Sequence, residues 1–121
     1  MLICVFLATE TAEARGGKDG DGEVRVAGVC GGAAKAKLKL KARDGGIELE
    51  FEIEHSRGYG LWRVAIVHER RVVWKGSART SRSSDAFRVE RRLPDLVGAD
   101  TVTARAWGPG GVTCRATATL P

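Results

Sequence analysis

Strict alternation of charged and apolar residues between Lys35 and Glu54 constrains the fold of this chain more than any other feature. Four lysines alternate with small or apolar residues up to position 42, and four glutamates alternate with apolar residues from position 47. A period of two predicts two β-strands that each bury one face, and the intervening Asp44-Gly45 predicts a hairpin turn. In a helix the same lysines would be scattered around the whole cylinder, so strands are favoured.

The same pattern predicts the register of the hairpin. If Asp44 and Gly45 form the turn, every lysine faces a glutamate on the neighbouring strand, and a four-residue loop over 43–46 gives the same pairs. A slip by one residue would bury charges, so a single register is favoured. Each opposed pair is expected to stabilise the fold by about 0.2–1 kcal/mol. The expected pairs are Lys41–Glu48, Lys39–Glu50, Lys37–Glu52 and Lys35–Glu54.

Similar short segments recur along the rest of the chain. With 121 residues and 16 glycines, the chain is long enough for one domain, which we place at 23–121. Strands with hairpin-length connections predict an all-β protein, an antiparallel immunoglobulin-like β-sandwich of seven or eight strands. The strands are expected at 23–30, 35–42, 47–54, 61–68, 71–78, 86–93, 101–107 and 112–119.

The first 14 residues resemble the end of a secretory signal peptide. An apolar run is followed by Ala12-Glu13-Ala14, which fits a small-x-small cleavage pattern. A basic region before the apolar run is missing, so we expect a truncated segment with the true start upstream; a first strand or a disordered tail is the alternative. Residues 15–22 are expected to form a flexible linker. These features predict a secreted or extracytoplasmic protein.

The cysteines fit the same location. Cleavage after Ala14 would leave Cys30 and Cys114, which both fall on the inward faces of their predicted strands. In a small exported domain such a pair predicts a disulfide, here between the first and last strands, whereas two free buried thiols are the alternative. Because neither cysteine lies in a CxxC motif and the histidines are not paired, no metal site is expected.

Trp62 gives a further indication of the fold. It alternates with Arg63 and shares an inward face with Val64 and Ile66. A buried Trp on a central strand beside an inter-sheet disulfide is typical of immunoglobulin-like sandwiches, although the Cys…Trp…Cys spacing differs from that of antibody domains.

Several segments also carry a resemblance to other proteins. They are VRVAGVC, KLKLKARDGGIELEFEIE, LWRVAIVHERRVVWKG, FRVERRLPDLVGADTVTARA and TCRA. Over most of residues 23–121 the chain resembles small exported immunoglobulin-like β-sandwich proteins of GC-rich bacteria. The absence of Asn and Gln and the abundance of Ala, Arg and Gly agree with such an origin. The resemblance implies the fold and export, and it implies no activity.

Basic residues are concentrated in the second half of the chain. Residues 55–121 hold 12 basic and 5 acidic groups. An Arg-rich surface attracts anionic polymers and anionic lipid surfaces, whereas a solvated face of a basic protein is the alternative. The expected contact residues are Arg70, Arg71, Arg79, Arg82, Arg88 and Arg92, together with the aromatic residues Tyr59 and Trp107.

Three further residues, two tryptophans and one arginine, depart from the simple pattern of apolar residues inward and polar residues outward. Trp107 is expected to point outward, where it would hold a partner or a sugar or would cover the end of the sandwich. Arg91 shares a face with apolar neighbours such as Val89, so we expect it at a sheet edge or beside a carboxylate. Trp74 follows Val72 and Val73 and has no assignable face.

Catalysis is not expected. His55 and His68 are the only histidines, and the serines lie in turn-like segments without a nucleophile-elbow motif. We expect a monomeric, non-catalytic binding or structural module without a cofactor. Its expected partner is an anionic polymer, an anionic lipid surface or another protein rather than nucleic acid. The alternative is a secreted inhibitor or small-ligand carrier that uses the loop end, and a hydrolase built on either histidine is less favoured.

Overall fold

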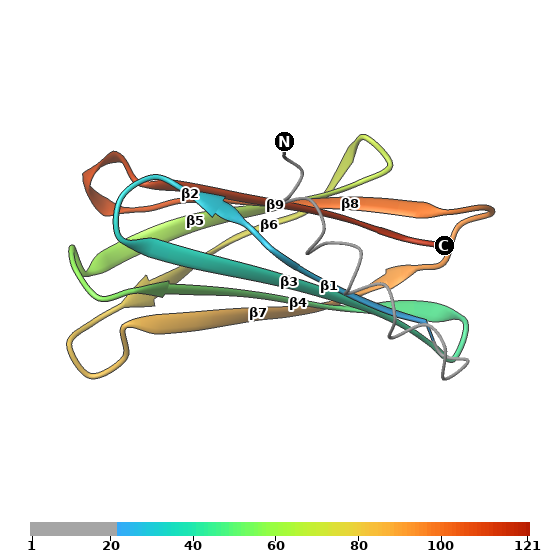
Figure 1. The fold of residues 1–121 in the computed structure, drawn as a ribbon, viewed down its shortest axis with the longest axis horizontal. Helices are drawn as coiled ribbons and strands as arrows, with labels where there is room; N and C mark the ends of the chain where they lie inside the picture. The colour runs from blue at the N-terminus through green and yellow to red at the C-terminus, as the bar shows by residue number, and fades with distance from the viewer. Residues whose placement is uncertain (1–21) are drawn as a thin grey trace, which may run out of the picture.

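The computed structural model describes residues 22–121 as two antiparallel sheets that pack face to face (Figure 1). The strands are β1 (Glu23–Ala27), β2 (Val29–Cys30), β3 (Ala34–Arg43), β4 (Gly46–His55), β5 (Gly60–His68), β6 (Arg71–Thr80), β7 (Ala86–Pro94), β8 (Asp100–Trp107) and β9 (Thr113–Leu120), and the short turn η2 covers Pro109–Gly111. Sheet A has the order β1-β3-β4-β7, and sheet B has the order β2-β9-β8-β5-β6. The predicted all-β, antiparallel architecture is confirmed.

The N-terminal predictions cannot be compared with this fold. The segment resembling a signal peptide, 1–14, and linker residues 15–21 lie outside the described residues. Within residues 22–121, no helix is long and apolar enough to cross a membrane.

The β3–β4 hairpin has the register predicted from its charges. Lys41 lies opposite Glu48, and the pairing continues without a slip to Lys35 opposite Glu54. Asp44 and Gly45 form the turn with φ values of 53° and 76°. Positive φ at both central residues matches the twist of the flanking strands, which explains the Asp-Gly pair.

Large apolar side chains from both sheets fill the space between them. Phe51 of β4 and Trp62 of β5 are fully buried, and the Trp62 ring lies 5.8 Å from that of Phe87 in a tilted arrangement. Each such side chain stabilises the fold by about 1.5–3 kcal/mol relative to an exposed position. The predicted inward face of Trp62 is therefore confirmed.

The first predicted strand, 23–30, is divided in two at Gly28. Before Gly28 the chain pairs with β3 in sheet A, and after it the chain pairs with β9 in sheet B. A Cβ atom on Gly28 would lie only 2.9 Å from the Ala36 Cβ atom and from the Arg115 carbonyl oxygen. Glycine therefore lets the chain pass between the two sheets in close contact with both.

This crossing determines the position of the disulfide. Cys30 and Cys114 are bonded, so the predicted link between the first and last strands is confirmed. Both residues belong to sheet B and lie directly opposite each other on β2 and β9. The expectation of an inter-sheet disulfide was wrong, because the chain has already crossed to sheet B at Gly28.

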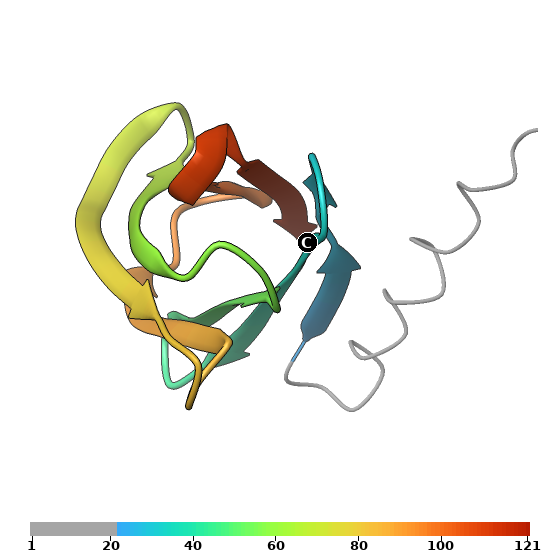
Figure 2. The same ribbon diagram turned by 90° about the vertical axis from the view of Figure 1, so that its left-hand side faces the viewer.

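The β6 and β7 strands form edges of the two sheets on one side of the sandwich, opposite β1 and β2 (Figure 2). Arg91 lies on β7, which confirms the predicted sheet edge, and its guanidinium lies 5.0 Å from the centre of the Trp74 ring. The face of Trp74 could not be predicted because the pairing of β5 with β6 shifts by one residue between Ile66 and Val67. Trp74 lies opposite Ile66. An inward-pointing charge on an edge strand opposes pairing with a second sheet.

Outward-facing charges on sheet A form rows that cross all four strands. One row alternates in sign, whereas a second has like charges paired at both ends. Opposite charges in facing positions stabilise a sheet and like charges destabilise it. The alternating row is Glu23–Lys41–Glu48–Arg92, and the second row is Arg25–Lys39–Glu50–Glu90.

We expect exchange of the charges of Lys39 and Glu50 to stabilise the protein. Lys39→Glu combined with Glu50→Lys keeps this pair and converts both like-charge contacts, with Arg25 and Glu90, to opposite-charge contacts. The expected gain in the free energy of unfolding is about 1 kcal/mol at low salt, and it should shrink at high salt.

The matched control exchanges Lys41 and Glu48 in the alternating row. That exchange creates like-charge contacts with Glu23 and Arg92, so the free energy of unfolding should fall. Urea denaturation of the two double variants measures the difference. Equal effects in both rows would show that the cross-strand charges do not govern stability.

Candidate binding surface

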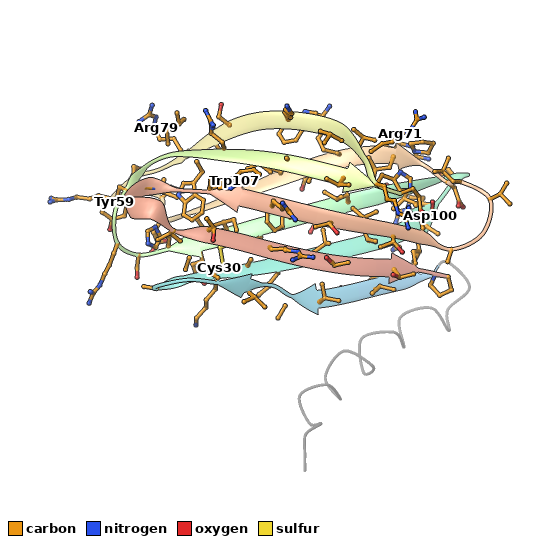
Figure 3. The ribbon with its side chains drawn as sticks, turned by 90° about the horizontal axis from the view of Figure 1, so that it is seen from above. Cys30, Tyr59, Arg71, Arg79, Asp100 and Trp107 are labelled. Atoms are coloured by element: carbon orange, nitrogen blue, oxygen red, sulfur yellow. A yellow bond between two sulfur atoms is a disulfide. The ribbon has the colours of Figure 1, made fainter. Side chains whose placement is uncertain are left out.

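The predicted contact residues lie on four separate parts of the molecule. Arg71 lies at the end of the sandwich opposite Tyr59 and Arg79 (Figure 3). Trp107 lies on the outer face of sheet B, toward the Tyr59 end. The fold therefore does not join the predicted residues into one patch. The four parts are the outer face of sheet A (Arg88, Arg92), the β5–β6 turn (Arg70, Arg71), the loops at the other end (Tyr59, Arg82) and the outer face of sheet B (Arg79, Trp107).

On sheet A, the predicted arginines are engaged with the protein itself. Arg92 Nη2 donates hydrogen bonds of 2.7 Å and 3.1 Å to the carbonyl oxygens of Arg43 and Asp44, and so holds the hairpin turn. Arg88 lies opposite Glu52 and donates a hydrogen bond of 3.4 Å to Glu90. A hollow of about 370 Å³ on this face is lined by both lysines and glutamates. Sheet A thus presents a balanced mixture of charges.

The outer face of sheet B carries only positive charge. Among the described residues, the outward positions of its five strands include no Asp or Glu. None of its cations forms an ion pair with a carboxylate within residues 22–121. We call this surface the basic face, and its members are Arg63, Lys75, Arg79, Arg105, Arg115 and Trp107.

Period-two alternation produces the basic face. Along β5, β6, β8 and β9, mostly apolar or small residues point toward the core, and most outward residues are polar or basic. Leu61, Ala65 and Val72 are apolar residues at outward positions. The pairing then brings Arg63 opposite Trp107, and Arg105 opposite Arg115. Directly opposed like charges destabilise a sheet. Arg105 and Arg115 therefore form a site whose charge a bound anion would offset.

The basic face is hollowed beside Trp107. The hollow has a volume of about 660 Å³, with Arg63, Trp107 and Lys75 among the residues that line it. Trp107 is 43% exposed and points outward, as predicted. The basic face thus combines uncompensated charge, an accessible aromatic ring and a concave surface.

Arg63, Arg105 and Arg115 were not among the predicted contact residues. They are dispersed along the chain and do not form a cluster of charge in the sequence. Their alternation with core residues indicates outward side chains, and this was the available signal. What the alternation cannot indicate is that β5, β8 and β9 are neighbours in one sheet.

The loop end contains the first histidine. His55 is buried, and its ring meets Trp62 edge-on at a centroid distance of 5.4 Å. His55 Nδ1 and Trp62 Nε1 are buried without a hydrogen-bond partner among the described residues. Tyr59 lies in the loop that follows His55, between Gly58 and Gly60, and is 42% exposed. This end therefore holds both an exposed aromatic residue and a buried imidazole.

The opposite end contains the second histidine in a polar cluster. His68 Nε2 lies 2.8 Å from Asp100 Oδ1, and both side chains are almost completely buried. Asp100 Oδ1 also accepts a hydrogen bond of 3.1 Å from the Leu96 N–H, and Glu69 accepts one of 2.6 Å from the Thr101 N–H. The ligand atoms of His68, Glu69 and Asp100 lie within 4.8 Å of one another, as a metal would require. Because all three already bond to one another or to the backbone, we interpret the cluster as a structural clamp.

Asp95 adds a third carboxyl group to this clamp, next to that of Asp100. A hydrogen bond to Asp100 raises the pKa of Asp95 above its ordinary value of 3.8, and partial desolvation and the charge of Asp100 raise it further. A raised carboxyl pKa stabilises the folded state below pH 3.8, and this contribution is lost as the pH rises through the folded-state pKa. At neutral pH the two carboxylates therefore repel each other.

We expect Asp95→Asn to raise the melting temperature at neutral pH, since it removes this repulsion and keeps a hydrogen-bond donor. The gain should shrink at pH values below 3.8, where Asp95 is already protonated. Thermal unfolding followed by circular dichroism across this pH range measures the effect. Asp95→Ala is the control, since it removes the donor as well and should lower stability in acid. A gain from Asn that is independent of pH would contradict this account.

Comparison with known proteins does not assign the chain to a family. No family model and no curated protein matches its sequence. Fold and surface therefore define it as an all-β, disulfide-linked protein of two antiparallel sheets, with a balanced outer face on one sheet and a basic outer face on the other.

Proposed function

We propose that this protein is an exported, non-catalytic binding module of the immunoglobulin-like class, and that its basic face binds an anionic partner. The observation that carries the proposal is the set of five cations on one sheet face without an acidic neighbour. Arg-rich surfaces of this kind attract polyanions and increase the rate of association with them.

The strand pairing supports the immunoglobulin-like class. Strands β4 and β7 pair in one sheet while β5 and β8 pair in the other, and β8–β9 form a hairpin. Immunoglobulin domains pair strands B with E and C with F, and F and G are neighbours. In this correspondence β5 takes the place of strand C, which carries a buried Trp in those domains, and Trp62 lies on β5.

The disulfide supports export. A Cys30–Cys114 bond is compatible with an extracytoplasmic protein, because disulfides persist in oxidising compartments and are rare in the cytosol. Outside the cytoplasm, anionic polymers and lipid head groups of the cell envelope are accessible partners for a basic surface.

The geometry of the basic face supports binding over a merely solvated surface. Arg105 and Arg115 lie directly opposite each other on neighbouring strands, with no ion pair to a carboxylate within residues 22–121. Trp107 lies on the same face and is 43% exposed. Trp and Arg are enriched among the residues that contribute most of the binding energy at protein interfaces.

The proposal is tested by removing three charges from each face in turn. The basic-face variant carries Arg63→Gln, Arg105→Gln and Arg115→Gln. Binding to immobilised polyphosphate and polygalacturonate is measured at increasing salt concentration. Each lost contact lowers the slope of log K against log salt by somewhat less than one, so the triple variant should lose about two.

The matched control carries Arg25→Gln, Lys35→Gln and Lys37→Gln on sheet A, with the same change in net charge. It should bind both polymers nearly as the unchanged protein does, because those cations face or flank glutamates. Equal losses in both variants would show attraction by net charge alone and would refute a dedicated basic face.

A further inference from the structure

The hollow on the basic face has the shape and the chemistry of a site for one ring. Its walls include Trp107 on β8 and Lys75 on β6, and Arg63 and Ser77 also line it. Between these walls, β5 contributes Ala65. A small side chain in the middle of a row of long ones leaves the space of about 660 Å³.

Ala65 is the residue on which the hollow depends. It lies opposite Lys75 on β6 and opposite Arg105 on β8. It points outward, away from the core cluster, yet it is only 9% exposed. The long basic side chains on both sides therefore rise above it and leave an apolar floor with charged walls.

We propose that this hollow binds one pyranose ring of an acidic polysaccharide, an inference that rests on the proposed function of the basic face. The apolar face of the ring stacks on the exposed indole of Trp107, whose large rigid surface provides contact area. A carboxylate or sulfate on the ring pairs with Arg63 or Lys75, and its hydroxyl groups have the Ser77 hydroxyl as a partner.

Neighbouring cations extend the site along the polymer. Arg105 on β8 and Arg115 on β9 lie in the row next to the one that contains Arg63 on β5 and Trp107 on β8. Rows on one face of a strand are separated by two residues, or about 7 Å, and strands by about 4.8 Å. Charged groups on adjacent sugars thus meet adjacent cations while one ring occupies the hollow.

The surface favours a polysaccharide over the other polyanions. Single-stranded nucleic acid is bound by a series of aromatic side chains on which successive bases stack, whereas Trp107 is the one aromatic residue on the basic face within residues 22–121. Peripheral membrane binding buries a continuous apolar face at the head-group boundary, whereas the surface beside Trp107 is concave and includes Arg63 and Lys75.

The experiment fills the hollow without changing the charge. Ala65→Leu places a larger side chain on the floor, and Ala65→Ser is the matched control that leaves the space open. Trp107→Ala removes the stacking surface at an exposed position and provides a second test if Ala65→Leu destabilises the fold. Binding of each variant to polygalacturonate, polyphosphate, single-stranded poly(dT) and anionic phospholipid vesicles is measured at one salt concentration.

We expect Ala65→Leu and Trp107→Ala to weaken binding of polygalacturonate by about tenfold, as loss of one stacked ring implies. Binding of polyphosphate, which has no ring, should stay within about twofold, and Ala65→Ser should resemble the unchanged protein.

Two results separate this inference from the proposed function. If both variants bind polygalacturonate normally while the basic-face triple variant loses it, the ring site is refuted and the basic face remains. If the triple variant also binds every polymer normally, both proposals fail. Tighter binding of poly(dT) or vesicles than of polygalacturonate overturns the assignment to a polysaccharide.

Discussion

Replacement of Cys30 and Cys114 by alanine is expected to lower the free energy of unfolding by about 4 kcal/mol. The bond closes a loop with a sequence separation of 84 residues. Chain-entropy estimates for a loop of this length give about 4.5 kcal/mol, most of it from restriction of the unfolded chain. Cys114 is buried and Cys30 packs against the core, so alanine preserves the apolar surroundings of both.

Urea denaturation of the double variant beside the unchanged protein gives the measurement. Reduced and alkylated protein should resemble the double variant, whereas Cys4→Ala, which leaves the bond intact, should not change the midpoint. Intact-mass analysis that finds free thiols at both positions in exported material would contradict the disulfide. An unchanged midpoint in the double variant would show that the bond contributes nothing to stability.

The second large effect is expected from Asp100→Ala, which should lower the free energy of unfolding by about 3 kcal/mol. This substitution leaves the buried imidazole of His68 and the part-buried Leu96 N–H without their acceptor. An unsatisfied buried group costs about 1–3 kcal/mol, and the part-buried N–H adds less. Because Asp100 begins β8 and Leu96 lies in the preceding loop, this loop should also become more susceptible to proteolysis.

Asp100→Asn is the matched control. An amide oxygen in the place of Oδ1 still accepts both hydrogen bonds, and it carries no charge to repel Asp95. The expected loss is therefore well below that of Asp100→Ala. If Asn is as damaging as Ala, the negative charge rather than the acceptor holds the clamp, and our interpretation of the cluster is wrong.

Local sequence patterns predicted the strands and the hairpin because each strand of this protein alternates clearly. In the β3–β4 hairpin, charge and turn chemistry both point to the pairing of Lys41 with Glu48, and the structure has that pairing. The disulfide was predictable because Cys30 and Cys114 both alternate in step with the apolar residues that face the core.

The crossing at Gly28 was not predictable in the same way. Val26 and Cys30 lie an even number of positions apart, so the alternation of inward and outward positions continues through the point at which the chain changes sheets. Only the close approach of Ala36 and Arg115 shows why a glycine is present there.

The candidate site depended on a different kind of information. Alternation assigns Arg63, Arg105 and Arg115 to outward positions, but strand neighbours are set by long-range pairing. Arg88 and Arg92 belong to the same Arg-rich half of the sequence as these cations. The pairing of β7 with β4, however, places them opposite glutamates on the other sheet. Charge along a sequence therefore indicated a basic protein and could not locate its basic face.

The position of the disulfide also determines how the domain would respond to tension. The backbone enters β1 and leaves β9 at the same end of the sandwich, where a Cβ atom on Gly22 would lie 3.7 Å from the Leu120 side chain (Figure 1). Force applied between residues 22 and 121 would peel β1 and β9 from this end. It would then pass through the Cys30–Cys114 bond, so the 83 residues enclosed between the cysteines would carry no load. The basic face would therefore keep Arg63, Lys75, Arg79, Arg105 and Trp107 in place on a stretched chain.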